Sequence, residues 1–183
     1  DMDKIKNIMI EFVGKLQYEA GDKAEILAFD SIVQQMCNYT NNRNLLTNGI
    51  NNMSPDGSTA FYDAVYNGVS HAALQGGARC VIAFTDGMDN ESRHTADELV
   101  RYANDCQVPV YIIGVGYEVE ESILQNIAAK TQGKYWFIDD LYDLQTIFDE
   151  IYKEQKKLYA VEYVSDSSQD AYLSRDLNVS VTG

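Results

Sequence analysis

One stretch decides the predicted fold of this chain: Val81-Ile82-Ala83-Phe84-Thr85-Asp86-Gly87-Met88-Asp89-Asn90. It begins with a continuously apolar run, which is typical of a strand buried on both faces, and it ends abruptly in a turn. In an open α/β sheet, ligands bind in the crevice outside the carboxyl ends of such strands. Asp86 falls at that end of the strand. Its carboxylate is therefore predicted either to accept hydrogen bonds or to hold a cation.

Strand-like and helix-like patterns alternate on both sides of this stretch. Strands are predicted over residues 24–29, 32–37, 81–84, 108–116 and 134–138, with a polar loop at 38–44. Helices are predicted over residues 3–18, 45–51, 95–105, 120–131 and 141–157, and a further helix contains residues 64–73. This alternation is typical of an α/β fold, with a doubly wound, mostly parallel, Rossmann-like sheet.

The pattern changes at Leu158. Residues 1–157 are predicted to form one α/β domain, and residues 158–183 a C-terminal β extension. Within the extension, residues 158–164 and 177–181 each alternate apolar and polar side chains around a polar stretch. We interpret them as an antiparallel strand pair, which either caps the domain or begins the next module.

Three local features follow from residue type. Ser58 or Thr59 is predicted at or near the N-cap of the helix that follows, where a hydroxyl accepts hydrogen bonds from free backbone N–H groups. Gly133 is predicted at the C′ position of the helix before it, which favours glycine. Asp89 is predicted to be a solvated loop residue.

Charge limits the classes of partner. The chain has 28 acidic and 14 basic residues and a formal net charge of −14, which argues against binding to nucleic acid or to an anionic membrane. An acidic surface suits divalent cations, and it also simply keeps a protein soluble.

No apolar run reaches membrane-spanning length, so no membrane insertion is expected. We expect any targeting segment to lie outside this sequence. The three cysteines are widely spaced and are predicted to be small buried residues.

Three motifs, in this order, resemble the von Willebrand factor A domain. The motifs are Gly21-Asp22-Lys23-Ala24-Glu25-Ile26-Leu27-Ala28-Phe29-Asp30, Gly57-Ser58-Thr59-Ala60-Phe61-Tyr62-Asp63-Ala64 and Phe84-Thr85-Asp86-Gly87. The resemblance runs from residue 1 to about Tyr159, and the residues after it are similar to an extension that often follows bacterial members. Each motif is weak alone, but their order and the elements between them make the match specific.

The resemblance implies a metal-ion-dependent adhesion site at the carboxyl end of the sheet. Thr59 and Asp86 match residues of two of its loops, and Gly57, Ser58 and Gly87 belong to the supporting loops. Such a site holds Mg²⁺ or Mn²⁺, and an Asp or Glu carboxylate of a protein partner completes the shell. The chemistry is sensible in itself, because hard divalent cations take oxygen ligands and Mg²⁺ usually keeps several waters.

The chain departs from the family at its start. The family's first strand ends in Asp-x-Ser-x-Ser and supplies further ligands, but this chain begins at Asp1-Met2-Asp3, which resembles the helix after that motif. The missing strand would lie between the strands at 24–29 and 81–84, and a gap there leaves backbone groups unpaired. We therefore expect either that the sequence is a fragment, in which the metal site can be unoccupied, or that another segment fills the gap.

One candidate filler lies near the C-terminus. Residues 161–170 read as a strand followed by Asp166-Ser167-Ser168-Gln169-Asp170, which is close to the missing pattern. The segment could insert in its own chain or in a second copy, which would give a strand-swapped dimer. The alternative is a polar hairpin loop in the family's tail. We favour that alternative here, because short motifs often occur by chance.

The leading hypothesis is a non-enzymatic, metal-dependent protein-binding module of the adhesion type. We expect it on a bacterial cell surface or outside the cell, with the cytoplasm as the alternative. A second hypothesis is an assembly or regulatory subunit of an ATPase- or chelatase-type enzyme complex. A metal-dependent hydrolase is the weakest reading, because no base or nucleophile accompanies Asp86. His71 and His94 match no catalytic pattern and are predicted to be structural.

Overall fold

The fold was analysed in a computed structural model, which describes residues 2–54, 57–115, 120–138 and 144–155. The described helices are α1 (Met2–Val13), a 3₁₀ turn η1 (Tyr18–Ala20), α2 (Arg43–Asn51), α3 (Phe61–Ala73), α4 (Ala96–Asp105), α5 (Glu121–Lys130) and α6 (Leu144–Gln155). The described strands are β1 (Ala24–Phe29), β2 (Val33–Thr40), β3 (Val81–Thr85), β4 (Val110–Val115) and β5 (Tyr135–Ile138).

The strands form two groups. β3, β4 and β5 make a parallel sheet in that order, in which Val81 pairs with Val110 and Ile112 pairs with Tyr135. β1 and β2 make a separate antiparallel pair with an irregular register near Ile26. The predicted α/β class is therefore confirmed, but the antiparallel pair that the structure shows is N-terminal and not C-terminal. The pair that we predicted in the extension lies outside the described residues.

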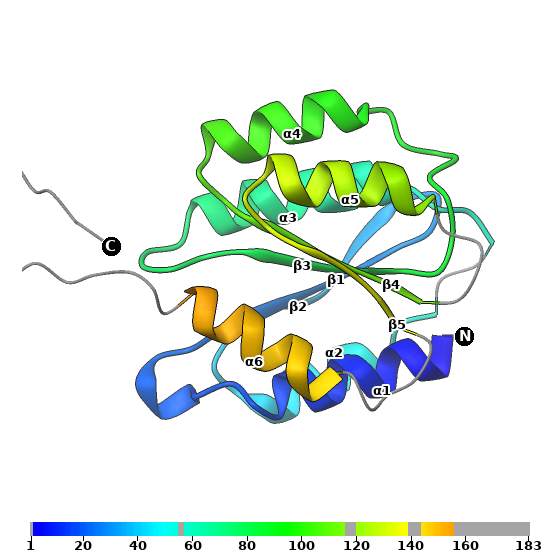
Figure 1. The fold of residues 1–183 in the computed structure, drawn as a ribbon. Helices are drawn as coiled ribbons and strands as arrows, with labels where there is room; N and C mark the ends of the chain where they lie inside the picture. The colour runs from blue at the N-terminus through cyan, green and yellow to red at the C-terminus, as the bar shows by residue number, and fades with distance from the viewer. Residues whose placement is uncertain (1, 55–56, 116–119, 139–143, 156–183) are drawn as a thin grey trace, which may run out of the picture.

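Helices cover both faces of the strands. α3, α4 and α5 lie on one face, and α1, α2 and α6 lie on the other (Figure 1). The first layer packs on β3 and β4 through a cluster that includes Val69, Leu99 and Ile127. The second layer packs through two clusters, one of α1 and α6 on β4 and β5, and one of α1 and α2 on β1. The arrangement is doubly wound, as the alternation of elements predicted.

Three boundaries differ from the sequence prediction. α1 ends at Val13 rather than near residue 18, and β2 continues through the stretch predicted as a loop, to Thr40. After α5, Gln132 takes the left-handed conformation (φ 62°) that was predicted for Gly133. Gly133 is needed for a different reason, because a Cβ there would lie 1.9 Å from the backbone oxygen of Val110. That close approach of the chain to β4 is a tertiary constraint, which local sequence does not reveal.

Candidate functional site

β1 and β3 run in the same direction. The segments after their carboxyl ends lie next to each other, and so do the segments before their amino ends. At the carboxyl ends, the N–H of Ala60 donates to the backbone oxygen of Asp30 just after β1 (2.7 Å), and Thr59 lies beside Gly87 just after β3. At the amino ends, Gln75 accepts from Lys23 before β1 and from Arg79 before β3. The two strands are thus parallel, although they belong to different sheets.

A cavity of about 820 Å³ separates these two strands. It is lined by every residue of β1 and every residue of β3, by α1 residues such as Met9 on one face, and by α3 residues such as Val65 on the other. One buried water needs only about 10–15 Å³. The cavity therefore has the position, the length and the walls of a missing central strand, as the sequence predicted for the gap between these strands.

The backbone of β3 confirms that its second edge is open. The N–H of Val81 donates to the oxygen of Pro109 on the β4 side (3.0 Å). In a parallel ladder, alternate residues bond to opposite neighbours, so the backbone groups of Ile82 and Phe84 point to the cavity. Within the described residues, β3 is hydrogen-bonded to β4 alone. Buried backbone groups are rarely left without partners, so this edge is built to receive a strand.

Thr59 and Asp86 lie at the carboxyl-end mouth of this cavity. Both residues line it, together with Gly57 and Ser58 from the turn before α3. Asn90 ties the two loops together, because its Oδ1 accepts from the N–H of Thr59 (2.8 Å) and its own N–H donates to the oxygen of Thr59 (3.0 Å). The structure thus brings the two predicted ligands to one place, on neighbouring loops.

The aspartates at this edge divide into two groups. Asp30, Asp63 and Asp89 each accept hydrogen bonds from backbone N–H groups, for example Ile32 to Asp30 at 2.9 Å. Among the described residues, no group donates to the exposed carboxylate of Asp86, and the hydroxyl of Thr59 has no hydrogen-bond partner there either. Two oxygen donors at the mouth of the cavity therefore have no hydrogen-bond partner within the described residues.

The start of α3 corrects two sequence predictions. The N-cap residue is Ala60, and neither Ser58 nor Thr59 caps the helix. Asp89 does so from the neighbouring loop, because its Oδ2 accepts from the N–H of Tyr62 (2.9 Å), so it is not a solvated loop residue. A local prediction places the cap next to the helix in sequence, whereas here the fold supplies it from a distant segment.

Asp63 completes a reciprocal clamp between α3 and that loop. The N–H of Asp63 donates to the Ser92 hydroxyl (3.0 Å), while its carboxylate accepts from the N–H groups of Arg93 and His94. Burial raises the pKa of the Asp63 carboxyl, but the hydrogen bonds from His94 and Arg93 outweigh burial and lower that pKa overall. No sequence pattern revealed this clamp. Its only local signal is an acidic residue in the first turn of a helix.

His94 and His71 both pair with acidic side chains. The Nδ1 of His94 lies 2.6 Å from Asp63, and its ring stacks on Tyr66 at 4.0 Å. The Nδ1 of His71 lies 3.0 Å from both carboxylate oxygens of Glu25. These contacts tie helices to loops and strands, which agrees with the structural roles that the sequence predicted.

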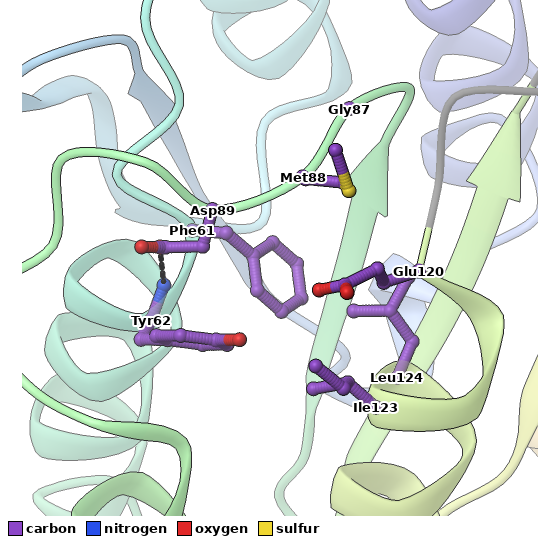
Figure 2. Close-up of a pocket in the computed structure, with 8 residues that line it drawn as sticks. All are labelled: Phe61, Tyr62, Gly87, Met88, Asp89, Glu120, Ile123 and Leu124. Atoms are coloured by element: carbon purple, nitrogen blue, oxygen red, sulfur yellow. Dashed lines mark hydrogen bonds between the residues drawn. The ribbon is translucent and has the colours of Figure 1, made fainter.

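A second, very small cavity lies on the other side of the Asp86 loop. Figure 2 shows the Phe61 ring pointing toward the start of α5, with Met88 above it and the Glu120 carboxylate opposite. Its volume is about 10 Å³, which holds about one water molecule. Burial, and then the charges of Asp89 and Glu120, raise the pKa of Tyr62 beside it. The cavity is too small for a ligand. Of the predicted site residues, Gly87 alone lines it.

The mouth offers oxygen donors that suit a hard cation but are too few to hold one alone. Mg²⁺ requires near-octahedral coordination by oxygens, and Thr59 and Asp86 supply two of the six positions. Within the described residues, no group of three or more His, Cys, Asp or Glu side chains could hold a metal ion. The residues present therefore fit part of a shell that water, a partner carboxylate or a strand in the cavity would have to complete.

Comparison with known families identifies the fold. The family profile of the von Willebrand factor type A domain matches residues 1–150. The chain belongs to this family. Domains of the von Willebrand factor A family are usually non-catalytic modules and are often used for metal-dependent protein binding. Among proteins with curated functions, none matches the sequence.

Solved structures share the fold of this von Willebrand factor A domain at low sequence identity. BatB from Bacteroides thetaiotaomicron is 20% identical with a TM-score of 0.69, and the match covers 83% of this chain and 87% of BatB. A von Willebrand factor type A protein from Catenulispora acidiphila is 18% identical with a TM-score of 0.70, covering 84% of this chain and 38% of the other. Proximal thread matrix protein 1 from the mussel byssus, with a zinc-occupied MIDAS motif, is 19% identical with a TM-score of 0.63, covering 82% and 41%.

The described part of the domain contains no helix that is both long enough and apolar enough to cross a membrane.

Proposed function

We propose that this von Willebrand factor A domain is a metal-dependent protein-binding module, in which Thr59 and Asp86 help to hold Mg²⁺ or Mn²⁺ and a partner's Asp or Glu carboxylate completes the shell. The observation that carries this proposal is the contrast among the aspartates at the carboxyl edge. Asp30, Asp63 and Asp89 have backbone partners, while Asp86 is exposed and free within the described residues.

A free carboxylate beside a free hydroxyl suits a cation that is shared with another molecule. One formal negative charge from the domain leaves a divalent cation with net positive charge, so an incoming carboxylate is attracted to it. A fully acidic pocket would neutralise the ion and remove that attraction. The mussel protein with a zinc-occupied MIDAS motif supports the proposal by analogy, since it shares the fold. We further propose that the module acts on a bacterial surface or outside the cell.

The test is Mn²⁺ binding followed by electron paramagnetic resonance, with the full-length protein. Asp86→Asn removes the charge at nearly constant shape and is expected to weaken Mn²⁺ binding by about tenfold or more, as expected for a lost charged ligand. Asp97→Asn is the matched control, because Asp97 is an exposed aspartate on α4. Mn²⁺ binding that Asp86→Asn leaves unchanged would refute the site.

Partner binding gives a second test. An excess of EDTA is expected to release a bound partner, and Mg²⁺ in excess of the chelator is expected to restore the complex. A complex that survives EDTA would show that the domain binds its partner without a cation.

A further inference from the structure

Large apolar side chains are exposed at four places in the described part of the chain, and two of these lie beside the mouth of the cavity. The four are Ile32 (60% exposed), Leu45 (52%), Leu74 (82%) and Met88 (53%). A single exposed apolar side chain is ordinary at a protein surface, but apolar side chains that gather around a site often mark an interaction surface. Ile32 and Met88 belong to the loops after β1 and β3, at the carboxyl ends of both strands.

A closed turn after β1 holds Ile32 at this edge. The N–H of Ile32 donates to the Asp30 carboxylate (2.9 Å), and the N–H of Asp30 donates to the backbone oxygen of Ile32 (3.1 Å). The backbone oxygen of Asp30 also accepts from the N–H of Ala60 (2.7 Å), which ties the turn to the loop that carries Thr59. Ile32 is therefore exposed on a braced turn.

Met88 lies on the opposite side of the mouth, in the loop after β3. Asn90 holds this loop in place, because it exchanges two hydrogen bonds with the backbone of Thr59 (2.8 and 3.0 Å). Met88 lies above the Phe61 ring and is still half exposed (Figure 2). Because β1 and β3 line opposite sides of the cavity, Ile32 and Met88 stand one on each side of its mouth.

We propose that the partner binds through an extended segment in which the Asp or Glu has one apolar residue two positions before it and another two positions after it. This inference rests on the proposed function, because the acidic residue is the one that completes the metal shell. Side chains of an extended segment alternate between two faces, so residues i−2 and i+2 point the same way as residue i. An acid that enters the mouth therefore directs its two apolar neighbours toward Ile32 and Met88. The thioether of Met88 suits this role, since methionine adapts to apolar partners of different shape.

The charge of this edge limits the residues next to the acid. Glu91 lies in the same loop as Met88, and Glu120 lies opposite Met88 (Figure 2); both are exposed. Arg93, farther along the loop, offsets one of these charges, and the whole chain carries a net charge of −14. Further acidic residues in the partner segment would be repelled here. We therefore expect its residues i−1 and i+1 to be uncharged or basic.

The test uses the full-length protein in Mn²⁺ and short fluorescent peptides with blocked ends, whose binding is followed by fluorescence anisotropy. The probes are Leu-Ser-Asp-Ser-Leu, Ser-Ser-Asp-Ser-Ser and Leu-Ser-Asn-Ser-Leu. Partial burial of two leucine side chains should make the first peptide bind about tenfold or more tightly than the second. The third peptide has no carboxylate, so its binding should not respond to EDTA.

Variants of the protein locate the apolar contacts. Ile32→Ser and Met88→Ser together are expected to weaken binding of Leu-Ser-Asp-Ser-Leu by about tenfold and to leave Ser-Ser-Asp-Ser-Ser unchanged. Mn²⁺ binding, measured by electron paramagnetic resonance, should stay the same in the double variant, because neither side chain offers the cation a hard oxygen ligand. Leu45→Ser is the matched control, since Leu45 is about as exposed as Met88 but lies on α2, and it should change neither peptide.

A fourth probe, Leu-Glu-Asp-Glu-Leu, tests the charge of the edge. It is expected to bind several-fold more weakly than Leu-Ser-Asp-Ser-Leu, and the difference should shrink in high salt, because salt screens exposed charges. Equal binding of these two peptides at low salt would overturn the expectation for residues i−1 and i+1.

Three results would overturn the apolar recognition. One is equal binding of the leucine-flanked and serine-flanked Asp peptides, and another is an equal loss of both in the double variant. The third is binding of Leu-Ser-Asp-Ser-Leu that EDTA leaves unchanged, because the acid would then not bind through the cation. Failure of every probe to bind the Mn²⁺-loaded protein would count against it in the same way.

Mn²⁺ binding by Asp86→Asn separates this inference from the proposed function. If Asp86→Asn leaves Mn²⁺ binding unchanged, the metal site is refuted and the inference falls with it. If Asp86→Asn weakens Mn²⁺ binding but the peptides are not distinguished, the metal site stands and only the apolar recognition is refuted.

Discussion

β4 and β3 are neighbouring apolar strands with very different surroundings. All six residues of β4 are buried, and Ile112 and Ile113 are 0% exposed. In β3, only Ala83 and Thr85 are buried among five residues. β4 has a strand on each side, while β3 has β4 on one side and the cavity on the other. The comparison teaches that an apolar strand becomes core only when both of its neighbours are present.

The largest expected effect comes from truncating the packed strand. Ile113→Ala in β4 is expected to lower the free energy of unfolding by about 2–5 kcal/mol, because the side chain is fully packed. Ile82→Ala in β3 is expected to cost less, because Ile82 is only partly buried and borders the cavity. Urea denaturation followed by circular dichroism compares the two variants with the unsubstituted protein. An Ile82 cost as large as the Ile113 cost would break the comparison.

Gly→Ala substitutions at two positions compare the packing around β4 with the packing around β3. A Cβ on Gly133 would meet the backbone oxygen of Val110 in β4 at 1.9 Å, so Gly133→Ala is expected to destabilise by about 1–3 kcal/mol or more. A Cβ on Gly68 in α3 would lie 3.3 Å from the side chain of Val81, which borders the cavity and can move. Gly68→Ala is therefore expected to be neutral or to stabilise by up to about 1 kcal/mol. Thermal unfolding gives both values, and a large loss for Gly68→Ala would show that β3 is already rigidly packed.

Asp89 and Asp86 lie on the same loop but should differ in how much they contribute to the stability of the fold. Asp89→Ala removes the acceptor for the start of α3 and is expected to cost about 1–2 kcal/mol of stability. Asp86→Ala is expected to change stability by no more than about 0.5 kcal/mol in the absence of metal, since no described group donates to it. Chemical denaturation in EDTA tests the pair. A clear loss for Asp86→Ala would mean that Asp86 has a structural partner.

The smallest expected effect is the pH dependence that Asp63 contributes. Its folded pKa lies below the usual value of 3.8, so the unfolded state binds the proton more readily. Its contribution to stability is therefore present above pH 3.8 and is lost as the pH falls through the lower folded pKa. Asp63→Asn should flatten the loss of stability on acidification over that window, measured by urea denaturation. An unchanged slope would show that the His94 loop does not hold Asp63 charged.

Sequence patterns found the elements but not the contacts between distant segments. The run at 81–85 and the alternation of strands and helices predicted the α/β class. The resemblance to the von Willebrand factor A family is what placed Thr59 and Asp86 on loops of one site. The cap of α3 was predicted wrongly, since Asp89 reaches it across 27 residues of sequence. Gly133 was predicted to be the C′ residue of the helix, but Gln132 takes the left-handed conformation. The contact of Gly133 with Val110 exists only after β4 and α5 pack.

The sequence by itself determined where the chain is apolar, where it turns, and which oxygen donors follow the strands, because these depend on residue type and local spacing. Tertiary structure alone decided which carboxylates have partners, and within the described residues it left Asp86 and Thr59 without a hydrogen-bond partner at one mouth of the cavity. It also decided that β1 and β3 face each other across that cavity. Hydrogen-bond partners and cavities depend on how segments far apart in the chain pack together, and no local sequence pattern encodes that packing.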